Sequence, residues 1–230
     1  MDPETAKFVT ELAKSVAQNV YGDAFSPAVK EVGGFLQDLA KTLRRALPQI
    51  QMMAVDQDRF RRFLEQSVDR VPLGQRTAPA EQLLGPIIEG IRYEPEGSIS
   101  DEAFSELLSR AFDRERVGQA HPAFPGLIRA LADDEIRLVR ALAVLEPLPF
   151  PVGDVPKPIL RATDIGLDHP TNLPIYLGHL GSLGLTVQPF GFEPENFAVQ
   201  IDGVHTYILS TWGLAFATAV ATSKHEAKGS

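Results

Sequence analysis

Apolar residues recur at three- and four-residue spacing along the first 145 positions, which is typical of amphipathic helices. About six helices are expected before residue 132, in the approximate ranges 2–20, 26–47, 60–71, 83–91, 100–112 and 122–131. Serine and Ser-Pro signals mark several starts, and prolines mark several ends. We expect Ser100 to cap the fifth helix and Gly118 to end it in a left-handed conformation. Asp133 or Asp134 should cap a seventh helix that runs to residue 145.

The pattern changes after residue 146. Residues 147–158 hold five prolines, which no helix interior tolerates, so this segment should be a connector or an extended insertion. Beyond it we expect a helical turn near 158–165, a helix over 171–183, strands within 186–190 and 197–209, and a helix capped by Ser210. Asp202-Gly203 predicts a two-residue hairpin between the strand segments.

This order of elements is the outline of a winged helix. The sequence therefore predicts a mainly α protein with a helical domain over 1–132 and a winged-helix-like α+β domain over 133–222, which contains the β-hairpin. The proline-rich insertion 147–158 lies within the second domain, and residues 223–230 should form a disordered tail.

Charge and composition narrow the classes of function. The formal net charge is −8, and the basic residues are not clustered enough for broad binding to a phosphate backbone. The chain has no cysteine, which excludes disulfides, thiolate metal sites and cysteine nucleophiles. No apolar run reaches the roughly 20 residues of a membrane span, and the first residues lack the features of a signal peptide. We expect a cytoplasmic protein.

The densest group of chemically active side chains lies in the corner after the fifth helix. Its candidate residues are Asp113, His121, Pro122 and Phe124. A general base formed by His121 with Asp113 or Glu115 is one interpretation. The favoured one is a structural or interaction corner between two helices, because no hydroxyl or lysine partner is placed beside the histidine. The histidines form no metal-binding motif, so no catalytic residue, metal or cofactor is expected.

The helix over 171–183 would be the recognition helix of a winged helix. Its candidate contact residues are Asn172, Tyr176 and His179, and it contains no lysine or arginine. DNA is therefore an unfavoured partner, and a protein contact is favoured. Gly178 and Gly181 should let a neighbouring helix approach closely, and Gly184 should end the helix.

The second helix carries an apolar stripe that could make three kinds of contact. The stripe consists of Val32, Phe35, Leu36, Leu39 and Leu43 and is flanked by basic residues. It can pack against other helices, which is the favoured interpretation. It can also lie on a membrane surface, which would place the protein at the periphery of the inner membrane, or bind a second copy of the chain.

Several segments resemble the abortive infection alpha family. The matching motifs are Gly85-Pro86 with Tyr93, the helix from Phe104 to Asp113, and the corner His121-Pro122-Phe124 with Ile128 and Leu131. Towards the end, "YLGHLGSLGLT" and "YILSTWGLAF" also resemble family segments, so the similarity spans about residues 20–220. The resemblance implies a role in phage defence and assigns no catalytic residue. The resulting hypothesis is a non-enzymatic defence protein that contacts a protein partner, phage-encoded or host, or itself. A winged-helix DNA-binding regulator is the alternative.

Overall fold

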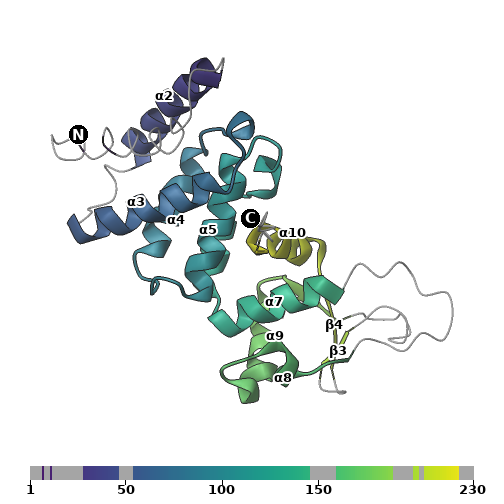
Figure 1. Ribbon diagram of the computed structural model, residues 1–230. Helices are drawn as coiled ribbons and strands as arrows, with labels where there is room; N and C mark the ends of the chain where they lie inside the picture. Colours follow the sequence, from purple (N-terminus) through teal and green to yellow (C-terminus); the bar gives the residue numbers. More distant parts are fainter. Residues whose placement is uncertain are drawn as a thin grey trace, which may run out of the picture. The chain divides into compact units, whose positions relative to one another are not determined.

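The computed structural model describes Lys7, Glu11 and residues 28–46, 54–145, 159–188, 199–201 and 205–222. These residues are mainly helical, with one small sheet, as expected (Figure 1). The chain divides into two compact units, Met1–Gly126 with Thr222–Ser230, and Leu127–Ala221. The division falls six residues before the boundary predicted at 132. Most of the expected first helix, the proline-rich segment 147–158 and the tail 223–230 lie outside the described residues.

Unit 1 is built around one buried helix. Its helices are α2 (Ala28–Ala46), α3 (Ala54–Asp69), α4 (Glu81–Ile91) and α5 (Ile99–Phe112), with 3-10 turns η2 (Leu73–Gln75) and η3 (Val117–Gln119). From Ala103 to Phe112 every residue of α5 is buried, and α3 and α4 both pack against it. The core is filled by large side chains: Phe60, Leu64, Leu84, Ile87, Phe104, Leu107 and Phe112. Burial on all sides explains why α5 shows a weaker amphipathic pattern than its neighbours.

The cap of α5 differs from the prediction. Ser98, not Ser100, is the N-cap residue, and its hydroxyl oxygen accepts the Asp101 amide at 3.1 Å. The Asp101 carboxylate reaches back to the Gly97 amide at 3.0 Å. The arrangement is similar to a capping box, with the difference that the Asp101 carboxylate accepts the amide of Gly97 and not that of the cap residue Ser98. Ser100 already lies inside the helix and is buried. The expected left-handed turn at Gly118 is also absent, because only Gly97, Gly166 and Gly184 have positive φ among the described glycines.

Unit 2 combines helices with the sheet. The short helix α6 (Phe124–Ala130) spans the division between the units and begins two residues after the predicted Pro122. The elements that follow are α7 (Asp133–Leu145), β1 (Ile159–Leu160), α8 (Ala162–Ile165), η4 (Pro170–Asn172), α9 (Leu173–Ser182), β2 (Thr186–Val187), β3 (Val199–Ile201), β4 (His205–Leu209) and α10 (Thr211–Val220). The strand order is β1-β3-β4-β2, with β1 parallel to β3 and the other pairs antiparallel.

Local signals in unit 2 agree with the expected helix ends. The Ser210 hydroxyl oxygen accepts the Gly213 amide at 2.9 Å and caps α10. Pro174 lies in the first turn of α9, and Gly184 has φ 70° behind that helix. β2 ends at Val187, before the end of the predicted range 186–190, and residues 189–198 lie outside the described residues. Ile201 pairs with His205, so three residues separate the paired positions of the β3–β4 hairpin, not the two expected from Asp202-Gly203.

Candidate functional site

The α2 stripe is part of the core of unit 1. Phe35, Leu39 and Leu43 are buried, and Leu36 is half-buried. The Phe35 ring meets the Phe112 ring of α5 edge-on, with centroids 6.2 Å apart. The side chain of Val32 lies outside the described residues. The buried members of the stripe therefore pack inside unit 1, as the favoured interpretation expects.

Asp113 fastens the corner after α5. Its carboxylate is buried and accepts the Glu115 amide at 2.9 Å and the Arg116 Nε–H at 2.6 Å. Its backbone pairs with Arg76 in an isolated antiparallel bridge. The Arg114 amide also donates to the Gln75 carbonyl at 2.8 Å. The Asp113 carboxylate thus shapes its own loop, and backbone hydrogen bonds hold that loop beside the loop before α4.

The other three candidate residues of the corner differ in burial. Phe124 is buried, whereas His121 and Pro122 are exposed. The His121 Nδ1 accepts the Ala123 amide at 3.1 Å, and its ring lies 5.5 Å from the Phe124 ring. The histidine therefore covers the start of α6. With Nδ1 used as an acceptor and the Asp113 carboxylate bonded to Glu115 and Arg116, this geometry resembles a helix-start support more than a catalytic dyad.

Sequence reasoning missed a buried ion network on α5. Glu106 is almost fully buried, and its two oxygens accept from Arg70 at 2.7 Å and from Arg110 at 3.2 Å. Arg110 Nε also donates to the Gln119 side chain at 3.2 Å. The available signal was the spacing of Glu106 and Arg110, four residues apart on a helix whose other positions are mostly apolar or small. Such a network is costly to break, because one lost partner leaves a buried charge uncompensated.

The densest polar cluster of unit 2 centres on Asp134, at the start of α7. Its Oδ1 accepts the Asp168 amide at 2.8 Å, and its Oδ2 accepts the His169 amide at 2.9 Å and the Tyr176 hydroxyl at 3.1 Å. Arg137 donates to the same carboxylate at 2.9 Å and to Asp168 at 2.7 Å. The sequence predicted that Asp133 or Asp134 would cap this helix. The Asp134 carboxylate instead binds groups outside α7. It holds the segment that leads into α9.

Electrostatics keeps this carboxylate charged. Burial alone raises the pKa of Asp134. The two backbone amides, the Tyr176 hydroxyl and Arg137 favour the charged form more strongly, so the pKa of Asp134 lies below its ordinary value. Burial raises the pKa of Tyr176, and its hydrogen bond to Asp134 raises it further, so the phenol stays protonated as a donor.

Glu135 makes the second contact between α7 and α9. One oxygen accepts the Ala132 amide at 2.8 Å, which closes the first turn of α7, and the other lies 2.7 Å from His179 Nδ1. Glu135 is buried, and the His179 side chain is 38% exposed. Asn172 donates to the Tyr176 hydroxyl at 3.5 Å. All three residues predicted to contact a partner from this helix are thus engaged with unit 2 itself.

The outward face of α9 is poorly suited to binding a nucleic acid. Ile175 is 68% exposed on it, and its neighbours Thr171, Gly178 and Ser182 are also exposed. None of these carries a positive charge. An added Cβ at Gly178 would meet nothing within 4 Å, and one at Gly181 only the Thr186 hydroxyl at 3.8 Å. The expectation that these glycines admit a neighbouring helix is therefore wrong for the described part of the chain.

The described residues contain no group of three or more histidine, aspartate or glutamate side chains placed to hold a metal ion. No helix among them combines the length and the apolar character needed to cross a bilayer.

Comparison with known proteins gives one match. The sequence pattern of the abortive infection alpha family matches residues 53–220, from the start of α3 to the end of α10. No curated protein and no solved structure matches the chain significantly. The matched range includes both the Asp113 corner and the Asp134 cluster. The chain is therefore a member of the abortive infection alpha family.

Proposed function

We propose that this chain is a phage-defence protein that acts by binding another protein and not by catalysing a reaction. The family match over 53–220 carries the defence role. The binding mode is supported by the side chains that could otherwise do chemistry. Asp113, Asp134 and Glu135 are each buried and bonded within the chain, where they hold loops and helices in place.

We interpret unit 2 as a winged-helix-like domain. Its elements follow the order expected from the sequence: α7, β1, α8 and α9, then a hairpin formed by β3 and β4. In this interpretation α9 takes the place of the recognition helix. Its inner face is fixed by Asp134 and Glu135, and its outer face, around Ile175, is free of charge. Such a face suits a protein surface better than a phosphate backbone.

A plating assay tests the defence role. Bacteria that express the chain are compared with bacteria that carry the empty vector, across a broad panel of phages. We expect fewer plaques for at least one phage. In liquid culture, expressing cells should survive a low phage dose and collapse at a high dose, because abortive infection sacrifices infected cells. Unchanged plaque numbers with every phage would refute the defence role.

A DNA-binding regulator is the second candidate, because the order of elements in unit 2 is also that of many DNA-binding domains. It predicts that duplex DNA retains the chain at low salt and releases it as salt rises. We expect no retention, since α9 has no lysine or arginine and Asn172 and His179 bond within the unit. A salt-sensitive gel shift would reverse our ranking of the two candidates.

We do not extend the proposal to membrane attack. That idea required the α2 stripe to be available, and Phe35, Leu39 and Leu43 are buried against the rest of unit 1.

A further inference from the structure

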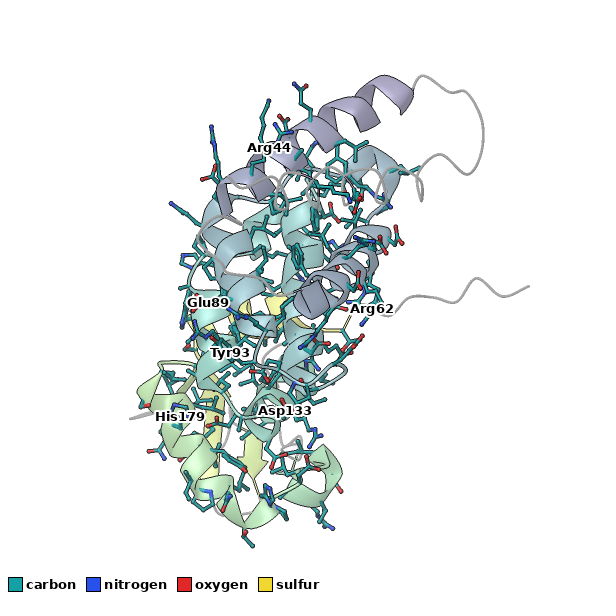
Figure 2. All side chains as sticks on the ribbon, turned by 90° about the vertical axis from the view of Figure 1, so that its left-hand side faces the viewer. Arg44, Arg62, Glu89, Tyr93, Asp133 and His179 are labelled. Carbon is teal, nitrogen blue, oxygen red and sulfur yellow. The ribbon has the colours of Figure 1, made fainter. Side chains whose placement is uncertain are left out.

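One side of α9 is exposed and carries no charge. Spacings of three and four residues place its members on one side of the helix, with Gly178 at the centre. The members are Thr171, just before the helix, Pro174, Ile175, Gly178, Gly181 and Ser182, and we call them the α9 face. The opposite side of α9 is buried, and Glu135 holds the helix through His179, which is labelled in Figure 2.

The glycine at the centre of this face has no role in packing within the chain. A Cβ at Gly178 would meet nothing within 4 Å. Glycine in a helix interior lowers stability relative to alanine, and close approach of another backbone is one reason to keep it. Ile175, one turn before it, is 68% exposed. The α9 face therefore has room for a second helix, and it carries an apolar side chain for that helix to cover.

A buried hydroxyl lies at one end of the face. Thr186 in β2 is 3% exposed, and its Oγ1 has no hydrogen-bond partner among the described residues. It lies 3.8 Å from the place that a Cβ at Gly181 would take. Burying a hydroxyl without a hydrogen bond lowers stability. Because glycine puts no side chain beside this hydroxyl, a polar group of a partner packed on Gly181 can approach it.

The shape of the α9 face is complementary to itself. The larger Pro174 and Ile175 stand four and three residues before Gly178, and the small Gly181 and Ser182 stand three and four residues after it. A two-fold axis at Gly178 that relates two antiparallel helices turns the large end of one copy onto the small end of the other. In such an isologous contact both copies use the same residues.

Charge also favours a second copy as the occupant. The chain has a formal net charge of −8, so two copies repel each other wherever their acidic surfaces meet. The α9 face has no acid and no base, so it offers no ion pair to an acidic or a basic partner. The exposed Asp164 and Asp168 precede the helix, and an antiparallel arrangement keeps the acids of the two copies at opposite ends of the contact.

We propose that α9 packs antiparallel against α9 of a second copy, with Gly178 at the crossing and Ile175 of one copy on Ser182 of the other. This inference rests on the proposed binding function and names the partner of α9. The helix has ten residues and is about 15 Å long, so the contact is smaller than the roughly 1,200–2,000 Å² of a stable interface. We therefore expect a weak dimer, with a Kd of about 10–100 µM.

Sedimentation equilibrium of the full chain over a range of concentrations tests the dimer. The mass of the wild type should rise from monomer towards dimer. Ile175→Glu should weaken association at least about tenfold, because it places a charge in an apolar contact twice. Val144→Glu is the matched control, since Val144 is 77% exposed at the end of α7 distant from Glu135, and it should associate as the wild type does. Circular dichroism must show that both variants keep the wild-type fold, as expected for exposed positions.

Cysteine cross-linking tests the antiparallel arrangement. The chain has no cysteine, so every disulfide reports on an introduced position. A mixture of Ile175→Cys and Ser182→Cys should form mixed dimers under mild oxidation, because a disulfide requires Cα atoms within about 7 Å. Tyr93→Cys is the control for random encounter. Tyr93 is 70% exposed in unit 1, and its variant should form far fewer mixed dimers with Ile175→Cys.

Three results would each overturn the proposal. The first is a wild type that stays monomeric throughout the concentration range. The second is association that Ile175→Glu leaves unchanged. The third is a yield of mixed dimers between Ile175→Cys and Ser182→Cys that does not exceed the yield with Tyr93→Cys.

The same variants separate this inference from the defence role. If the wild type dimerises and reduces plaques and Ile175→Glu does neither, both stand. If the wild type reduces plaques and stays monomeric, the α9 contact fails and the defence role survives. If the wild type dimerises through α9 and has no effect on any phage, the defence role fails and the contact stands.

Discussion

Gly213 in α10 should be irreplaceable, whereas Gly178 in α9 should accept a side chain. A Cβ at Gly213 would overlap the carbonyl oxygen of Leu185 and approach its carbonyl carbon to 2.8 Å. That carbonyl is fixed, because it accepts the Ser210 amide at 3.0 Å, and the Leu185 amide bonds to Leu180 at 2.9 Å. A backbone carbonyl cannot move aside in the way that a side chain can by changing its rotamer. At Gly178 nothing lies within 4 Å of the added Cβ.

The expected sizes follow from three effects. Overpacking at Gly213→Ala costs about 1–3 kcal/mol, and disturbing the Ser210–Leu185 hydrogen bond costs about 1 kcal/mol. Alanine returns about 0.5–1 kcal/mol, because it forms helix more readily than glycine. The free energy of unfolding of unit 2 should therefore fall by roughly 1–3.5 kcal/mol. Gly178→Ala should raise it by about 0.5–1 kcal/mol, since only the helix preference changes.

Urea unfolding followed by tryptophan fluorescence measures both changes. The chain has one tryptophan, and Trp212 directly precedes Gly213, so the signal reports on unit 2. With a urea slope of about 2 kcal/mol/M, the midpoint should fall by roughly 0.5–1.7 M for Gly213→Ala and rise by about 0.2–0.5 M for Gly178→Ala. A Gly213→Ala protein as stable as the wild type would refute the close approach between α10 and Leu185.

Three further predictions concern buried charge and the α2 stripe. Because the folded pKa of Asp134 is depressed, its contribution to stability is present above the unfolded pKa and is lost as the pH falls through the folded pKa. The thermal unfolding midpoint of the wild type should therefore decrease at pH values below about 4, and the midpoint of Asp134→Asn should decrease less steeply with pH there. Glu106→Gln should lower stability by about 3–5 kcal/mol in urea, because Arg70 and Arg110 lose their counter-charge, while the exposed Glu89→Gln should change it by less than about 0.5 kcal/mol. An equal effect of the two would contradict a buried network. Leu39→Ala should cost about 2–5 kcal/mol, and the wild type should release no dye from anionic vesicles, since Leu39 is fully buried; leakage, or a harmless Leu39→Ala, would mean that the stripe leaves the core.

Local features of the chain were predictable because their causes are local. The three- and four-residue spacing identified α2 to α5 and the face of α2 that must be buried, and the Ser210 cap and Gly184 marked helix ends. The cap at Ser98 was also predictable, since Ser98 and Asp101 stand three residues apart. The prediction of Ser100 was wrong because it placed the first acidic residues too early in the helix.

Partners distant in sequence were decided only by the tertiary structure. Asp134 resembles a helix cap in the sequence, yet its carboxylate bonds to Asp168, His169 and Tyr176, 34 to 42 residues away. Glycine spacing pointed to Gly178 and Gly181, while the close contacts occur at Gly90, against Phe104, and at Gly213. Periodicity tells which face of a helix must leave water, because apolar area is costly to expose. It does not tell what covers that face, since burial is favourable against any apolar surface and the chain's folding chooses which one.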